Sequence, residues 1–258
     1  MTARIHPTAL VASSAEIGVD VEIGPFAIIG KECVIGDGCV IAARATLEQY
    51  VTLGKSVQIG VGTVLGSDPQ DLKFKGERTT VEVGDNTVIR EYTTINRGTS
   101  QSFKTTVGAN SFIMSYVHVA HDCHVGEAVV LANMVQLAGH VTVEDGVILS
   151  GVTAVHQFTR IGRNAIVGGC SRVSKDVPPF VKAVGNPMKL YGLNSIGLQR
   201  NGFSPETILE LKRAYRLLFR SELNIAQAVE RVMAEVEQIP EVMQLVQFVE
   251  SSQRGVAI

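Results

Sequence analysis

The chain has 258 residues, a formal charge of −2 and 45% hydrophobic residues, enough for one large domain or two modest ones. The near-neutral charge argues against a general nucleic-acid-binding protein, and no apolar run reaches the roughly 18 to 20 residues that span a bilayer. The sequence shows no secretory signal at its start and no Cys-x-x-Cys pair among its four cysteines, so we expect a soluble cytoplasmic protein with reduced thiols.

A repeat of six residues dominates the chain from Ile5 to Val173. Of the 29 positions counted at every sixth residue, 26 are Ile, Leu or Val, and the three exceptions fall in two polar stretches. A glycine often follows the aliphatic residue, and a small or β-branched residue comes four positions after it. A period of six fits neither a helix nor a simple alternating strand. It predicts short strands joined by tight turns, with three repeats in each three-sided coil.

The predicted fold is mainly β, a parallel β-helix of nine or ten coils stacked about 4.8 Å apart. Two polar excursions, near residues 67–80 and 98–106, interrupt the repeat, which restarts in phase after each. We therefore expect loops that project from intact coils, and such loops on a rigid scaffold often carry function.

The repeat ends at Pro178 and Pro179, and helical periods begin further on. We assign residues 1–187 to the β-helix and residues 188–258 to a C-terminal helical domain. Helices are predicted to begin at three points, each marked by a capping residue or a proline: Ser204–Pro205, Asn224 and Pro240.

Residues 18 positions apart should lie directly above one another in this fold. This places Gly139 and Gln157 over His121, and His140 over Asp122, with His156 in the neighbouring column. A single surface histidine is more often solvated or part of a subunit contact. Three stacked histidines and an acid within roughly 10 Å are the one cluster that has the character of a site.

A zinc site is the alternative for these histidines. His118, His121 and His124 recur every third residue, and hexapeptide carbonic anhydrases bind zinc through three histidines. Residues three apart on a triangular coil should point in different directions, so we expect no shared ion within one subunit. Ligands from two subunits stay open.

Six segments resemble the UDP-N-acetylglucosamine O-acyltransferase family of lipid A biosynthesis, within the hexapeptide-repeat transferases, and the resemblance covers the full length. The resemblance implies a left-handed β-helix, a homotrimer, and transfer of an (R)-3-hydroxyacyl group from acyl carrier protein to the 3-hydroxyl of UDP-N-acetylglucosamine. It implies neither a cofactor nor a metal. The segments are Asp71-Leu72-Lys73, Asn96-Arg97-Gly98-Thr99, Ala120-His121-Asp122-Cys123, Leu137-Ala138-Gly139-His140, Thr153-Ala154-Val155-His156-Gln157-Phe158 and Gly185-Asn186-Pro187.

The resemblance also implies roles for individual residues. His121 matches the general base, Asp122 would orient it, and the backbone of Gly139 would stabilise the oxyanion. Gly169 matches a position that limits acyl length, which predicts that a long chain is accepted. Residues implied to bind substrate are Gln70, Asp71, Lys73, His118, His140, His156, Gln157, Asn194 and Arg200.

The helical tail is locally basic and is a candidate dock for the acidic carrier protein, with an ordinary solvated helix face as the competing interpretation. The basic residues are Lys212, Arg213, Arg216 and Arg220.

Other functions remain in competition with the O-acyltransferase. They are the same reaction on the 3-amino analogue of the sugar nucleotide, a zinc-dependent carbonic anhydrase-like enzyme, and a non-catalytic scaffold. The related N-acyltransferases carry an additional N-terminal domain, for which a repeat that begins by Ile5 leaves no room.

Overall fold

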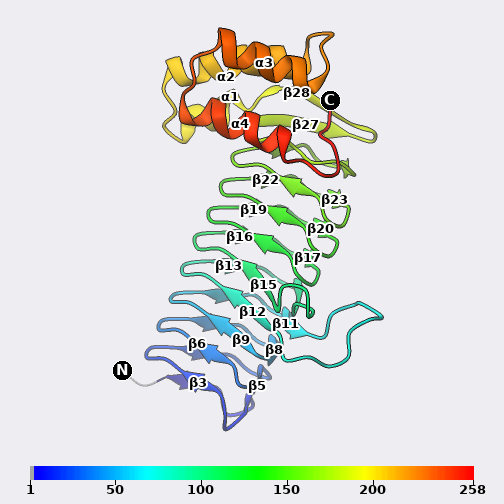
Figure 1. The fold of residues 1–258 in the computed structure, drawn as a ribbon. Coiled ribbons are helices and arrows are strands. Elements are labelled where there is room, and N and C mark those ends of the chain that lie inside the picture. Colours follow the sequence, from blue (N-terminus) through cyan, green and yellow to red (C-terminus); the bar gives the residue numbers. More distant parts are fainter. Residues whose placement is uncertain (1–2) are drawn as a thin grey trace.

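The computed structural model describes residues 3–258, in which stacked coils form a three-sided prism with a group of helices at its C-terminal end (Figure 1). Within this range the strands form three sheets, and every pairing of strands is parallel except that of β27 with β28. The nine-stranded sheet contains β2 (Leu10–Val11), β5 (Ile28–Lys31), β8 (Thr46–Gln49), β11 (Val64–Ser67), β14 (Thr94–Asn96), β17 (His118–Val119), β20 (Gln136–Leu137), β23 (Ala154–Val155) and β26 (Arg172–Val173).

The other two faces of the prism are the eight-stranded and eleven-stranded sheets. The eight-stranded sheet contains β3 (Glu16–Ile17), β6 (Val34–Ile35), β9 (Val51–Leu53), β12 (Thr80–Val83), β15 (Lys104–Val107), β18 (His124–Val125), β21 (Thr142–Val143) and β24 (Arg160–Ile161). The eleven-stranded sheet contains β1 (Arg4–Ile5), β4 (Glu22–Ile23), β7 (Val40–Ile41), β10 (Gln58–Ile59), β13 (Val88–Ile89), β16 (Phe112–Ile113), β19 (Val130–Leu131), β22 (Ile148–Leu149), β25 (Ile166–Val167), β27 (Val181–Gly185) and β28 (Met188–Leu193).

The core of the prism consists of the repeat's aliphatic residues and of the small residues four positions later. Both kinds are buried, as at Ile35 and Cys39. The glycines that follow the aliphatic residues are required by the close stacking of coils. A Cβ on Gly30, for example, would lie 1.6 Å from the carbonyl oxygen of Glu48 in the next coil.

The predicted coil of three repeats is confirmed around the histidine cluster, where His118 pairs with Gln136 and Gln136 with Ala154. The first excursion occupies residues 68–79, and Val51 of β9 pairs across it with Val81 of β12. The second occupies residues 97–103, and strands β14 and β17 pair across it. It ends earlier than predicted because Lys104–Thr106 already pair with Thr80–Glu82.

The C-terminal part begins with an antiparallel hairpin of β27 and β28, which the sequence did not predict. The boundary expected between residues 187 and 188 falls at the turn of this hairpin. Four helices follow: α1 (Ser195–Arg200), α2 (Pro205–Phe219), α3 (Ile225–Glu235) and α4 (Pro240–Glu250). The last three begin where predicted, with side-chain caps from Ser204 and Asn224 and a proline in the first turn of α4. None of the helices in residues 3–258 has the length and apolarity of a membrane span.

Candidate active site

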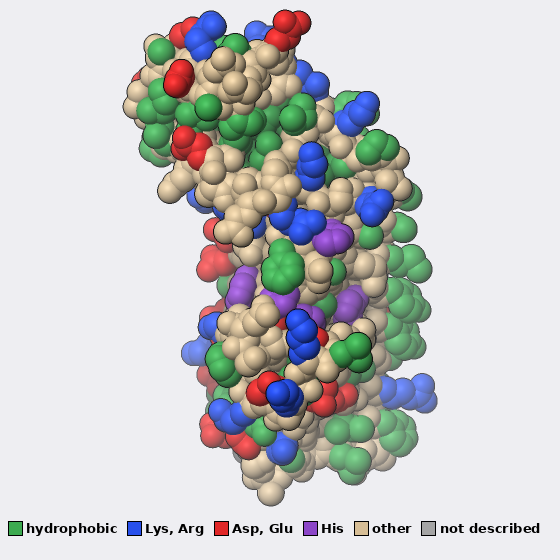
Figure 2. All heavy atoms as spheres, turned by 45° about the vertical axis from the view of Figure 1, so that its right-hand side comes forward, with side chains coloured by type: hydrophobic (Ala, Val, Ile, Leu, Met, Phe, Trp, Pro, Cys, Tyr) green, Lys and Arg blue, Asp and Glu red, His purple; other side chains and the backbone are tan. Residues whose placement is uncertain are grey.

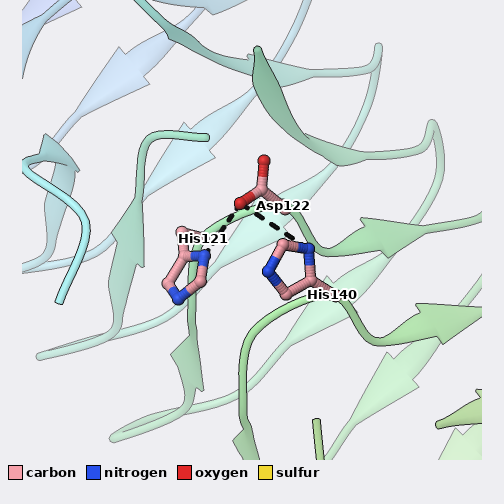
Figure 3. Close-up of side chains that lie close together, drawn as sticks. All are labelled: His121, Asp122 and His140. Carbon is pink, nitrogen blue, oxygen red and sulfur yellow. Dashed lines mark hydrogen bonds and ion pairs between the residues drawn. The ribbon is translucent and has the colours of Figure 1, made fainter. Parts of the chain in front are cut away.

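The histidine cluster lies at the edge of the prism where the nine-stranded sheet turns into the eight-stranded sheet, and histidine side chains gather at mid-height of the molecule (Figure 2). Between β17 and β18, His121 Nδ1 lies 2.8 Å from Asp122 Oδ2 (Figure 3). Because an ionised carboxylate only accepts hydrogen bonds, Nδ1 carries the proton in this pair. The Nε2 atom of His121 is then the basic nitrogen, available to take a proton from a substrate.

The second excursion holds the Asp122 carboxylate from the other side. Thr99 donates to it twice, from its backbone N–H to Oδ1 at 2.9 Å and from its hydroxyl to Oδ2 at 2.8 Å. Ser102 donates its N–H and its hydroxyl to Oδ1. Asp122 is only 2% exposed, so this carboxylate is a buried group with a full set of donors.

These donors decide the charge of Asp122. Burial by itself would raise the pKa of the carboxyl, but the hydrogen bonds from Ser102, His121 and Thr99 outweigh it and lower the pKa to about 2. Asp122 is therefore ionised at neutral pH and stabilises a proton on the His121 ring when the ring takes one up.

Gly139 lies directly over His121, as the spacing of 18 residues predicted. A Cβ at Gly139 would be 2.6 Å from Cε1 and 2.7 Å from Nε2 of the imidazole, so only glycine leaves the ring in place. Gly139 is buried, and among the described residues its N–H donates to no protein acceptor. This N–H is thus an unused donor on the residue that covers the imidazole.

His140 extends the cluster along the edge. Its ring packs edge-on against His121, with centroids 5.0 Å apart, and stacks on Phe158 at 4.4 Å. Burial lowers the pKa of His140 and outweighs the Asp122 charge, which acts in the opposite direction. The net effect favours a neutral His140 ring. A recess of about 240 Å³ is lined by His140 and Phe158 and reaches Arg160 and Ser251.

His121, Asp122 and His140 are the group within residues 3–258 whose ligand atoms lie close enough to share a metal ion, within 4.8 Å of one another. Asp122 already accepts five hydrogen bonds, two of them from Ser102. Both of its oxygens are therefore committed to donors, which favours a hydrogen-bonded acid–base pair over a metal centre. His118 and His124 bond instead to Thr94 and Thr106 on separate sheets.

The other residues predicted for this edge lie around the pair. His118 is on β17, and burial lowers its pKa, with a further contribution from His121. His156 and Gln157 are exposed, one coil above His140. In the first excursion, Asp71 acts on His140 by its negative charge, which brings the Gln70–Lys73 stretch into the electrostatic range of the site.

Three predicted residues lie on other edges of the prism. Asn194 caps α1 and donates to the carbonyl oxygen of Asn164, at the edge between the eight- and eleven-stranded sheets, and Arg200 ends the same helix. Gly169 lies at the third edge, between β25 and β26. One chain by itself therefore does not bring these residues to His121.

All four basic residues predicted on α2 are exposed, but they are not equivalent. Arg213 is paired with Glu210, and Arg220 donates to the carbonyl oxygen of Leu190. No ion pair within residues 3–258 engages Lys212 or Arg216, which share one face of the helix at a spacing of four.

Arg97, Thr99, Ser102 and Phe158 contribute to the site in ways that were not predicted from the sequence. The guanidinium of Arg97 is buried between the rings of Tyr50 and Phe74. It donates to backbone carbonyls at both ends of the first excursion, including those of Gly66 and Thr79. The signal that could have found Arg97 and Thr99 was their place in the segment Asn96–Thr99, one of the six that resemble the acyltransferase family.

Comparison with known proteins identifies relatives in sequence and in fold. A family model described as UDP N-acetylglucosamine O-acyltransferase, domain 2, matches residues 176–257, and one for bacterial transferase hexapeptide repeats matches residues 14–49 and 104–139. The acyl-(acyl-carrier-protein)–UDP-N-acetylglucosamine O-acyltransferase of Thermodesulfovibrio yellowstonii is 48% identical over 195 residues, which cover 75% of this chain and 76% of that protein.

Solved structures of such enzymes share the whole fold. The UDP-N-acetylglucosamine acyltransferase from Bacteroides fragilis is 42% identical, with a TM-score of 0.97 over 98% of this chain and 100% of that one. The enzyme from Francisella novicida is 37% identical, with a TM-score of 0.95 over 98% and 93%. The left-handed parallel β-helix with a C-terminal helical domain is thereby confirmed. On this identity and coverage, the chain is an acyltransferase and belongs to the UDP-N-acetylglucosamine O-acyltransferase family.

Proposed function

We propose that this enzyme transfers an (R)-3-hydroxyacyl group from acyl carrier protein to the 3-hydroxyl of UDP-N-acetylglucosamine, the first step of lipid A biosynthesis, with His121 as general base. A sugar hydroxyl is a poor nucleophile at neutral pH, so its proton must leave as its oxygen attacks the thioester carbonyl. His121 Nε2 accepts that proton, and Asp122 stabilises the imidazolium. The proton then passes to the departing thiolate as the tetrahedral intermediate collapses to ester and free carrier thiol.

The observation that carries the proposal is the Asp122–His121 pair lying beneath Gly139, a buried residue whose N–H has no protein acceptor within residues 3–258. An amide in this position can donate to the oxyanion of the tetrahedral intermediate. The absence of a side chain at Gly139 also lets the thioester approach the imidazole.

The test combines product identification with removal of the base. Mass spectrometry of the product made from UDP-N-acetylglucosamine and a mixture of 3-hydroxyacyl carrier proteins reports the acceptor and the chain length together. His121→Ala should lose at least about 100-fold in kcat, the lower range for a general base, while keeping the wild-type circular dichroism and melting temperature. A wild-type rate in this variant contradicts the mechanism, and acylation only of the 3-amino analogue contradicts the acceptor.

We propose further that the active enzyme is a homotrimer in which each site is shared by two chains. Asn194 and Arg200 lie on a different prism edge from His121, and a neighbouring chain could bring them to it. A column of hydrophobic side chains lines one edge of the prism (Figure 2). Within residues 3–258, the edge between the eleven- and nine-stranded sheets carries large apolar residues that are exposed by half or a little more, among them Phe26, Tyr92, Tyr116, Met134 and Val152.

Mixing two inactive variants tests the shared site. His121→Ala and Arg200→Ala chains, unfolded together and refolded as mixed trimers, should recover activity in about one site in four, because that fraction receives both wild-type residues. Light scattering should give three times the chain mass of 27.7 kDa. A monomer, or no recovery in mixed trimers, overturns this part of the proposal.

We assign roles to the remaining residues from the sequence resemblance. Gln70, Asp71 and Lys73 of the first excursion bind the sugar nucleotide together with His118, His140, His156 and Gln157. Lys212 and Arg216 are the members of the basic group on α2 that are free to bind an acidic carrier protein. The four unpaired cysteine thiols suit a reducing compartment, and we place the reaction in the cytoplasm.

A further inference from the structure

We propose that Thr99 and Ser102 are positioning residues of the reaction: the loop of residues 97–103 fixes the Asp122 carboxylate and thereby sets the basicity of His121. This inference rests on the proposed role of His121 as general base. It assigns a task to the second excursion, which contributes no strand of its own between β14 and β15.

The hydrogen bonds divide the two carboxylate oxygens between different partners. Oδ1 accepts only from the loop, through the N–H groups of Thr99 and Ser102 and the Ser102 hydroxyl. Oδ2 accepts the Thr99 hydroxyl and the Nδ1–H of His121, both at 2.8 Å. Rotation of the carboxylate would break several bonds at once, so Oδ2 stays directed at the imidazole.

The loop is shaped to deliver these donors. It closes on itself through a bond from the Phe103 N–H to the Thr99 carbonyl oxygen at 2.8 Å. A Cβ on Gly98 would lie 2.3 Å from the backbone nitrogen of Lys104, so glycine is needed where the chain returns. The backbone N–H of Asp122 is also fixed, by donation to the Thr105 hydroxyl at 2.9 Å.

The same bonds control how strongly Asp122 attracts a proton on His121. Four donors from the loop spread and neutralise part of the carboxylate charge, which limits the stabilisation of the imidazolium. Removing one of them concentrates negative charge on the oxygens, so Asp122 stabilises the imidazolium more strongly and less neutral base is left at a given pH. The other titratable groups around the pair include His118 on β17, Cys123 and His124 next along the chain, His140 on the next coil and Asp71 of the first excursion. The variants leave all of them in place.

The experiment measures pH–rate profiles of Thr99→Val and Ser102→Ala in the full chain. We expect the acid limb of kcat/KM to move up by about half a pH unit, so that the rate on this limb falls about threefold with little change in KM. Activity should then approach that of the wild type at alkaline pH. Thr99→Ser, which keeps the hydroxyl, should restore both the rate and the profile.

Thr106→Val is the matched control, because it removes a threonine hydroxyl 3.1 Å from the Nδ1 of His124, one strand away from the pair. Its profile should stay at the wild-type position. Nitrogen-15 NMR of the imidazoles gives a readout independent of turnover, in which the protonated fraction of His121 at a fixed pH should be larger in Thr99→Val than in the wild type.

An equal loss of rate at every pH, an unchanged protonated fraction of His121 in Thr99→Val, or the same change in Thr106→Val overturns the positioning role. These outcomes differ from failure of the proposed function. If His121→Ala turned over normally, the general base itself would be wrong, whereas an inactive His121→Ala beside a normal Thr99→Val removes only the role of the loop.

Discussion

Replacing Gly139 with alanine perturbs the site with a single methyl group. The added Cβ would lie 2.6 Å from His121 Cε1 and 2.7 Å from Nε2, and ordinary contact begins near 3.4 Å. The imidazole must therefore move by about 0.8 Å, since 3.4 − 2.6 = 0.8. A displacement of about 1 Å at a reacting group typically costs about 100-fold in rate, or roughly 2.7 kcal/mol of transition-state stabilisation.

The fold should tolerate the same change. Gly139 has no positive φ, and the atoms it would meet belong to a side chain that can shift, so we expect the melting temperature to fall by only a few degrees. Gly151→Ala is the matched control, because Gly151 has the same place in the repeat and its nearest contact would be 3.2 Å, to Asn133 O. Turnover of 3-hydroxyacyl carrier protein and thermal denaturation are measured on both variants. A wild-type rate in Gly139→Ala, or an equal loss in Gly151→Ala, refutes the placement of the base.

Three further perturbations test the surroundings of the site. Arg97→Lys keeps the positive charge but loses the planar guanidinium that donates to both ends of the first excursion. We therefore expect faster proteolysis of residues 68–79 and a higher KM for the sugar nucleotide. Unchanged proteolysis contradicts this role of Arg97. The pKa of Asp122, about 2, lies below the ordinary 3.8, so its ionised form stabilises the native state above pH 4 and loses this effect as pH falls towards 2. The melting temperature of Asp122→Asn should thus be lower than that of the wild type at neutral pH, and the difference should shrink below pH 4. Gly169→Met should shift chain preference towards shorter acyl groups in the mixed-donor assay, and an unchanged preference refutes the acyl-length role.

The spacing of 18 residues per coil predicted His121 beneath Gly139 and Asp122 beneath His140, because nothing interrupts the coils above residue 104. From there to β26 each coil adds three repeats, so sequence distance translates directly into height along the edge. The α2 and α3 starts were predictable for a different reason: the capping side chains of Ser204 and Asn224 act within three residues of their own position.

Residues whose contacts cross an excursion could not be predicted in this way. Strands that pair across an excursion, β9 with β12 and β14 with β17, are separated by more than three repeats, and within each loop no repeat fixes the height of a side chain. Thr99 therefore reaches Asp122 at a separation of 23 in the sequence, and Arg97 reaches Gly66 at a separation of 31, spacings that no periodicity marks.

This difference between the regular coils and the excursions has a chemical consequence. The repeat can place a base and an amide in one column, but every corner residue of a regular coil faces outward, as the half-exposed Phe158 does. A carboxylate left at such a corner would be solvated and free to rotate. An excursion that folds back over the corner buries Asp122 to 2% exposure and supplies donors that a plain coil lacks. The β-helix thus sets the positions of the reacting groups, whereas departures from the repeat set the protonation and orientation that make one of its histidines a base.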